Sequence, residues 1–193
     1  MNNSILFYNE NDKEYGYLSN FYGKKNDSNF KLVIDKKKWK TSEHYYQSCK
    51  FIDFPEYVEL IRNATTPNIA KIYATQKVQG GYPWRTKLNP IINEYKQKGV
   101  RIDRNWNKQK IDVMRYVLEE KFEQNPHLAK KLIDTYPYKL VEHTNRDAFW
   151  GDGIDGNGEN MLGRLLEEMR KELIEIEEAD KNLTESEKKL ANE

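Results

Sequence analysis

Apolar residues recur every three or four positions over much of the chain, which is the spacing of one face of a helix. The clearest stripe predicts a long helix that begins at Trp106, directly after Asn105 as its cap. A second stripe, from Met161 to Ile176, predicts a final helix that starts near Asn160. Shorter helices are predicted over 42–50, 53–63, 66–73 and 125–133. The pattern therefore indicates a mainly helical protein.

Strand patterns are few and short. Residues 5–8 and 140–143 are each long enough for one short strand, and 30–39 is typical of a hairpin that lacks an Asn-Gly or Asp-Gly turn. Residues 78–99 show no periodicity and contain several glycines and prolines, so we expect a long loop there, either a lid or a purely structural connection.

These elements predict a mainly α fold with a small β element (α+β), in one compact domain spanning 1–178. The chain has 193 residues, which suits one domain with a real core. Residues 179–193 are charged and poor in apolar side chains, so we expect a frayed or disordered C-terminal tail.

Charge and cysteine content narrow the class of protein. The 32 Lys and Arg residues nearly balance the 31 Asp and Glu residues, which gives no global reason to expect binding to nucleic acid or to an anionic membrane. Cys49 is the only cysteine, so no intrachain disulfide is possible and a reducing, cytoplasmic location is expected. The sequence shows neither a signal peptide pattern nor a membrane-spanning apolar run.

A polar row follows Thr41. Glu43, Tyr46, Gln47 and Lys50 are spaced so that they share one face of the predicted helix. An acid, an amide and an amine beside aromatic rings suit the wall of a binding site, although a solvated helix stripe has the same spacing. His44 has no second histidine or cysteine at metal-ligand spacing, so we expect no metal and no cofactor.

The stretch from Lys139 to Gly163 gathers glycines, the carboxylate of Asp147 and the indole of Trp150 ahead of a helix N-terminus. Such a loop can bind a base and a phosphate. Three other interpretations compete with this one. The run from Gly151 to Gly156 matches a dinucleotide-binding pattern, but the helix begins too late. The spacing of its acids fails for a calcium loop, and a plain surface loop remains an alternative. Gly163, inside the final helix, indicates a close backbone approach.

Several separate motifs occur in the order found in one family. They are Tyr15-Gly16, Leu18–Phe21, Trp39–Gln47, Arg101–Trp106, Met114–Asn125, Leu140–His143, Asp147, Phe149–Gly153 and Asn160–Gly163. Together they resemble the NADAR (YbiA-like) family over most of residues 5–175. The segment 78–99 is longer than in the compact bacterial members.

The resemblance implies a compact, mostly helical domain that acts as an N-glycosidase on a ribose C1–N bond. It implies two substrate classes. One is the phosphoribosylamino-pyrimidine intermediates of riboflavin synthesis, and the other is ADP-ribose attached to guanine bases, including guanine in nucleic acid. Such a bond can break through water that a carboxylate orients or through attack by an amine, and the two mechanisms stay open. Lys50 is the candidate amine, Glu43 a proton-transfer or ribose-hydroxyl contact, and Asp147 a second acid. The candidate substrate-binding residues are Asn20, Gln47, Trp106, Trp150, Gly151, Asn160 and Gly163.

Two other classes of function remain. The same loop and Trp150 would serve a module that binds ADP-ribose or another nucleotide without cleaving it. The charged C-terminal helix would serve an interaction role. The row of Glu43, Gln47 and Lys50 favours catalysis, because a binder gains little from an acid and an amine on one face. No membrane partner is expected, and the sequence does not predict an oligomeric state.

Overall fold

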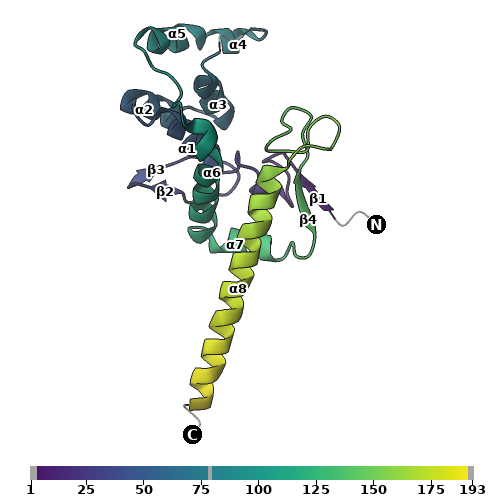
Figure 1. The fold of residues 1–193 in the computed structure, drawn as a ribbon. Coiled ribbons are helices and arrows are strands. Elements are labelled where there is room, and N and C mark those ends of the chain that lie inside the picture. The colour runs from purple at the N-terminus through teal and green to yellow at the C-terminus, as the bar shows by residue number, and fades with distance from the viewer. Residues whose placement is uncertain (1–3, 78–79, 191–193) are drawn as a thin grey trace. The chain divides into compact units, whose positions relative to one another are not determined.

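A computed structural model describes residues 4–77 and 80–190, and the side chains up to residue 183 (Figure 1). Helices dominate and strands are few, so the predicted mainly α fold with a small β element is confirmed. The chain divides into two compact units, one formed by Met1–Ser19 with Asn125–Glu193 and the other by Asn20–Gln124. Each is described by itself. None of the described helices combines the length and apolar character that crossing a bilayer requires.

The unit Asn20–Gln124 holds the hairpin and most of the helices. Its elements are β2 (Val33–Ile34), β3 (Lys37–Lys38), α1 (Ser42–Ser48), the 3-10 turn η2 (Cys49–Phe51), α2 (Pro55–Asn63), α3 (Pro67–Thr75), α4 (Pro83–Thr86), α5 (Asn89–Gln97) and α6 (Trp106–Glu123). Helix α1 packs against α2, α3 and α6. The residues of α1 are therefore surrounded by three other helices.

The predicted hairpin forms without glycine in its turn. β2 and β3 pair antiparallel, and the two residues between them, Asp35 and Lys36, have φ of 52° and 61°. Two positive φ values in a row are the requirement of the tight hairpin turn that matches strand twist. An aspartate tolerates that conformation better than most residues, whereas Lys36 adopts it at a cost.

Helices α4 and α5 overturn the expectation that residues 78–99 form a loop. Pro83 and Pro90 do not interrupt helices here, because each lies in the first turn of one, where a missing N–H costs nothing. Ile92 on α5 is completely buried in a core that includes Phe51, Tyr57 and Ile61. The segment is therefore anchored to the core of its unit through α5. Residues 78 and 79 lie outside the described part.

The second unit contains β1 (Ser4–Phe7), the 3-10 turn η1 (Gly16–Leu18), α7 (Pro126–Ile133), β4 (Lys139–Glu142) and α8 (Met161–Leu190). Strands β1 and β4 pair in parallel, with Ile5 opposite Leu140 (Figure 1). Helix α8 packs on β4 and α7 through the buried side chains of Leu162, Leu165 and Leu166.

Helix α8 continues beyond the expected domain end at residue 178. Its backbone is helical as far as Leu190, and the expected fraying of the tail 179–193 stays a prediction. Charged residues spaced four apart, such as Glu177 and Lys181 at 3.6 Å, favour a helix even where no apolar face is buried. Residues 191–193 lie outside the described residues.

Candidate functional site

Helix α1 begins where the sequence predicted, and its first turn is fixed by two side chains. The Thr41 hydroxyl accepts a hydrogen bond from the His44 amide at 3.4 Å, as a helix cap. The His44 ring lies 2.8 Å from that hydroxyl through Nδ1 and 3.1 Å from the Ala64 carbonyl through Nε2. A carbonyl only accepts, so Nε2 carries the proton. Burial lowers the pKa of His44 to about 4, and the ring is therefore a neutral structural group.

The predicted polar row is buried rather than solvated. Glu43 and Gln47 are 5% and 4% exposed, and the Gln47 side-chain amide donates to Glu43 Oε1 at 2.8 Å. The Glu43 amide donates to the Asn20 carbonyl at 3.0 Å, while the Asn20 side-chain amide donates to Met114 Sδ at 3.2 Å. The alternative of a solvated stripe is therefore wrong for Glu43 and Gln47.

Two acceptors in or beside this row have no hydrogen-bond partner among the described residues. Asn20 Oδ1 and Gln47 Oε1 are buried and accept no hydrogen bond from any residue that the structure describes. Leaving a buried polar atom unsatisfied costs about 1–3 kcal/mol. Such a cost is typical of groups that a ligand or water completes. A hydrogen-bond donor such as a sugar hydroxyl would satisfy either oxygen.

Lys50 lies in η2, one turn beyond Gln47. Its Nζ is 5.6 Å from the ring centroid of Tyr46 and 5.6 Å from that of Trp106, and the two rings meet edge to face at 5.0 Å. The Lys50 carbonyl accepts a hydrogen bond from the Asp103 amide at 2.8 Å, and the Trp106 amide donates to the Asp103 carbonyl at 3.1 Å. Asp103 therefore holds the start of α6 beside η2, which positions Trp106 against the lysine.

This surrounding changes the protonation of Lys50. Burial lowers the pKa of Lys50 to about 8; the nearby Glu43 carboxylate opposes that shift and Lys71 adds to it. At pH 7 a pKa of about 8 leaves roughly a tenth of the amines neutral, against roughly three in ten thousand for an unperturbed lysine. Burial raises the pKa of the neighbouring Cys49 thiol to about 11, so the thiol stays protonated at neutral pH. The amine is the better nucleophile of the two.

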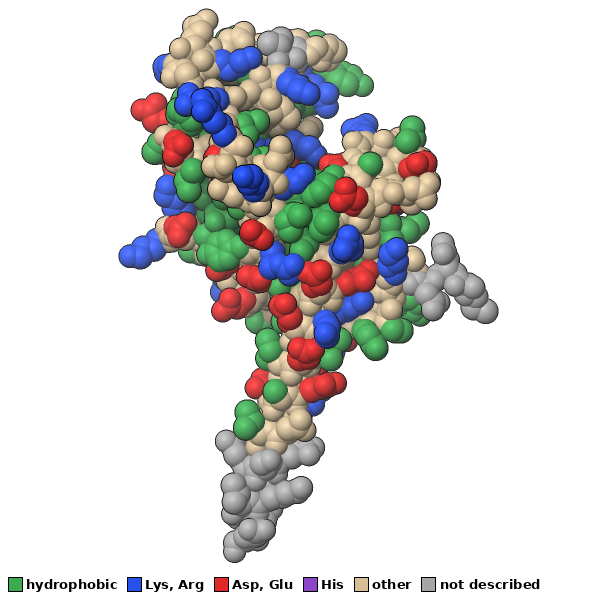
Figure 2. Space-filling view, viewed as in Figure 1, with side chains coloured by type: hydrophobic (Ala, Val, Ile, Leu, Met, Phe, Trp, Pro, Cys, Tyr) green, Lys and Arg blue, Asp and Glu red, His purple; other side chains and the backbone are tan. Residues whose placement is uncertain are grey.

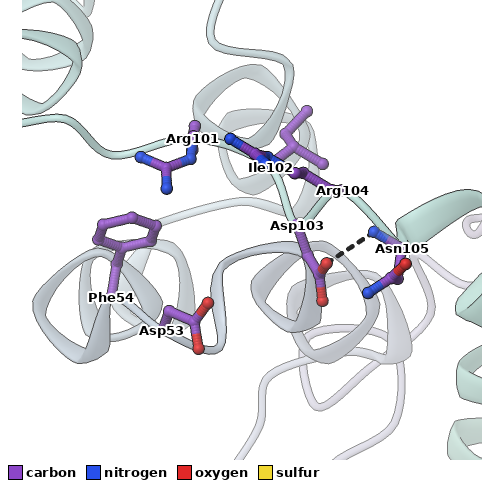
Figure 3. A pocket seen from close by; sticks show the side chains of 7 residues that line it. All are labelled: Asp53, Phe54, Arg101, Ile102, Asp103, Arg104 and Asn105. Atoms are coloured by element: carbon purple, nitrogen blue, oxygen red, sulfur yellow. Dashed lines mark hydrogen bonds between the residues drawn. The ribbon is translucent and has the colours of Figure 1, made fainter.

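A surface pocket of about 280 Å³ lies beside the segment that anchors Lys50 (Figure 3). It is lined by Asp53, Phe54, Arg101, Ile102, Asp103, Arg104 and Asn105. The Asp103 carboxylate accepts a hydrogen bond from the Asn105 amide at 2.7 Å, the bond drawn in Figure 3. The sequence indicates Arg101–Trp106 only as a family motif and does not predict this pocket. Two arginines three positions apart just before a helix are the signal that would have indicated it.

The glycine-rich loop of the other unit is closed on itself. Asp147 Oδ1 accepts hydrogen bonds from the amides of Phe149 and Trp150, at 3.0 and 2.9 Å. A Cβ at Gly151 would overlap the Thr144 methyl group, and one at Gly158 would overlap the Gly151 carbonyl. These glycines therefore allow the loop to pack against its own chain. This packing explains the glycine cluster without a bound phosphate.

The N-terminus of α8 is capped by the same loop. The amides of Met161 and Leu162 donate to the carbonyls of Phe149 and Trp150, both at 3.0 Å. These are donors that a phosphate at the helix end would need. The predicted phosphate site at this helix start is thus partly occupied by the protein's own backbone.

Asn160 and Gly163, predicted to bind substrate, both contact β4. The Asn160 side chain accepts from the Glu142 amide at 2.9 Å and donates to the Leu140 carbonyl at 2.8 Å. A Cβ at Gly163 would overlap that same Leu140 carbonyl. The close backbone approach expected at Gly163 is therefore an approach to β4. Nearby, Asp152 accepts from the His143 ring at 2.6 Å and from the Thr144 amide at 2.8 Å.

The candidate residues fall into two groups. Asn20, Glu43, Gln47, Lys50 and Trp106 lie in the unit Asn20–Gln124. Hydrogen bonds, ring contacts or a shared helix face connect all five of them. The others, Asp147, Trp150, Gly151, Asn160 and Gly163, belong to the second unit. Within the described ranges no three His, Cys, Asp or Glu side chains are arranged to hold a metal ion.

Buried acid and amide groups near a half-buried amine with a lowered pKa are an arrangement typical of enzyme active sites. The comparisons agree. The NADAR domain matches residues 6–174. "N-glycosidase YbiA" of Escherichia coli (strain K12) is 39% identical over 169 residues, which cover 88% of each chain. The chain therefore belongs to the NADAR family, as the resemblance implied.

Two further similarities extend this result. The NMR structure of the E. coli protein YbiA superposes with a TM-score of 0.66 at 37% identity, covering 93% of this chain and 89% of that one. "Riboflavin biosynthesis protein PYRR, chloroplastic" of Zea mays is 38% identical over 155 residues, 74% of this chain and 22% of that protein.

Proposed function

We propose that this NADAR-family glycosidase hydrolyses the bond between ribose C1 and a heterocycle nitrogen in a phosphorylated ribosyl compound. The observation that carries the proposal is Lys50, an amine with a pKa of about 8 that lies over two aromatic rings, two turns beyond the buried carboxylate of Glu43. The similarity to a protein named N-glycosidase YbiA supports the reaction class. Two substrate classes fit it: phosphoribosylamino-pyrimidines and ADP-ribose on guanine.

Lys50 would act as the nucleophile. The lone pair of its neutral Nζ adds to ribose C1, the bond from C1 to the ring oxygen breaks, and that oxygen takes up a proton. The heterocycle nitrogen then leaves with a proton, and C1 and Nζ become an imine. Water adds to C1, and release of the sugar aldehyde returns the free amine. Each step needs a proton moved near C1, which is the role we propose for Glu43.

The buried row would hold the sugar. The unpartnered oxygens of Asn20 and Gln47 accept hydrogen bonds, and ribose hydroxyls donate them. Trp106 places its aromatic ring beside the amine. Asp147 as a second acid and Trp150 as a stacking ring remain predictions. The Asp147 Oδ1 atom already holds two loop amides, which favours a positioning role for this residue.

The test is turnover of purified protein on both substrate classes. Lys50→Ala and Lys50→Arg should each lose turnover by a factor of roughly 100 or more, because arginine keeps the charge but is never a neutral nucleophile. Lys71→Arg is the matched control, since Lys71 is a nearby exposed lysine outside the polar row, and should turn over normally. Substrate binding with no turnover by the wild type would instead identify a nucleotide-binding module. Near-normal turnover by Lys50→Arg would contradict the nucleophile.

A further inference from the structure

The near-neutral total charge conceals a strongly basic segment. Residues 80–104 contain six Lys and Arg residues and two acids, a net charge of +4, while the whole chain has a net charge of +1. Figure 2 shows Lys and Arg side chains gathered over the part of the surface that α4 and α5 form. One of the acids, Glu94, pairs with Lys98 at 2.6 Å. Lys87, Lys96 and Arg104 form no ion pair with any residue that the structure describes.

Exposed aromatic rings lie within the same segment. Tyr82 and Trp84 are 66% and 42% exposed, although large aromatic side chains are usually buried. The guanidinium of Arg85 lies 5.9 Å from the Tyr82 ring centroid and 5.2 Å from that of Trp84. Arg85 Nε is buried and has no hydrogen-bond partner among the described residues. The two exposed rings and the guanidinium therefore lie together, and Arg85 Nε keeps a hydrogen-bond donor that no described residue uses.

We propose that the α4–α5 segment binds a single strand of nucleic acid. Phosphates complement the unpaired cations, and unstacked bases stack on Tyr82 and Trp84, which together are the features that recognise single strands without reading their sequence. A duplex fits less well, because its bases are already stacked and cannot cover the rings.

A membrane surface fits less well for a reason that the fold provides. Helix α5 turns its apolar residues inward: Ile92 is buried, and Leu88, Ile91 and Tyr95 pack around the same core. Helix α4 has no buried residue at all. The exposed face therefore offers two rings and no apolar stripe to insert into lipid, whereas a membrane-bound helix needs a continuous one.

The segment also ends beside the proposed nucleophile. Arg101 and Arg104 line the pocket of Figure 3, and the Asp103 amide between them donates to the Lys50 carbonyl. Binding of an unmodified strand does not depend on the proposed function.

The test uses a fluorescent single-stranded DNA oligonucleotide without modification, titrated with the full chain and followed by anisotropy. Trp84→Ala should weaken binding by roughly tenfold to a hundredfold, the value of one stacked base. Lys87→Glu with Lys96→Glu should weaken it further and reduce the slope of log K against log salt by about 1.4, for two lost phosphate contacts. Lys24→Glu with Lys25→Glu, two exposed lysines of the same unit, and Tyr8→Ala, an exposed ring of the other, are the controls and should bind as the wild type.

Two arms separate this inference from the proposed function. Lys50→Ala should bind the oligonucleotide normally, and the Lys87/Lys96 double variant should turn over a small ribosyl substrate normally. No binding by the wild type, equal loss in the control variants, or binding only to vesicles that contain phosphatidylserine would each overturn the inference. None of these results would bear on the glycosidase reaction.

Discussion

Replacing Gly163 by alanine separates a structural role from a substrate contact. Gly163 lies in the first turn of α8, where a Cβ would overlap the Leu140 carbonyl of β4. That carbonyl also accepts the hydrogen bond from the Asn160 side chain at 2.8 Å. An added methyl group must therefore push α8 away from β4 and disturb this bond, because a backbone atom cannot move aside as a flexible side chain does.

Two effects of opposite sign decide the magnitude. Alanine gains about 1 kcal/mol over glycine in a helix interior. Overpacking costs about 1–3 kcal/mol, and weakening one buried hydrogen bond costs about 1–3 kcal/mol more. The sum predicts that Gly163→Ala lowers the free energy of unfolding by about 1–5 kcal/mol.

Urea unfolding followed by circular dichroism measures this change. Gly80→Ala is the control, because a Cβ there meets nothing within 4 Å, and it should leave stability unchanged or raise it slightly. If Gly163→Ala is as stable as the wild type but has a raised KM, Gly163 contacts substrate rather than β4, and the structural argument fails.

Three further predictions follow from single groups. The kcat/KM of the wild type should rise with pH to an inflection near 8, because the reactive form of Lys50 is neutral and its pKa is about 8; a profile flat from pH 7 to 9 would contradict this. The pKa of His44 is about 4 in the folded state and 6.5 in the unfolded state, so between these pH values only the unfolded state binds the proton. The free energy of unfolding should therefore fall by up to about 3 kcal/mol as the pH drops from 6.5 to 4. The urea midpoint of His44→Gln should depend less on pH between 6.5 and 4 than that of the wild type, and equal dependence would refute the assignment. Truncation after Glu178 should leave the melting temperature unchanged, since residues 179–183 are exposed; a loss of several degrees would show that the tail packs.

Periodicity predicted the long elements correctly because their cores are continuous. The stripe behind α6 and the stripe at the start of α8 each repeat over several turns. The sequence does not predict the helices in residues 78–99, because α5 buries only Ile92 completely. One buried residue gives no apolar periodicity. Its prolines were interpreted as breaks, although a proline also starts a helix.

The candidate site was predictable only in part, for a related reason. Helical spacing alone indicated that Glu43, Gln47 and Lys50 share a face, and the structure adds their burial. A glycine cluster, in contrast, indicates a close approach without saying to what. At Gly151 and Gly163 the approach is to the protein's own backbone and side chains. The net charge of the whole chain, +1, does not reveal the excess of positive charge in residues 80–104.

The central claim is that Lys50 attacks ribose C1, and trapping of the covalent intermediate tests it most directly. Borohydride added during turnover reduces an imine to a stable amine, and peptide mass mapping then locates the sugar. The account predicts one sugar adduct on the peptide that contains Lys50 in the wild type and in Lys71→Arg, and none in Lys50→Arg. Full turnover with no adduct, or an adduct on another lysine, would contradict it.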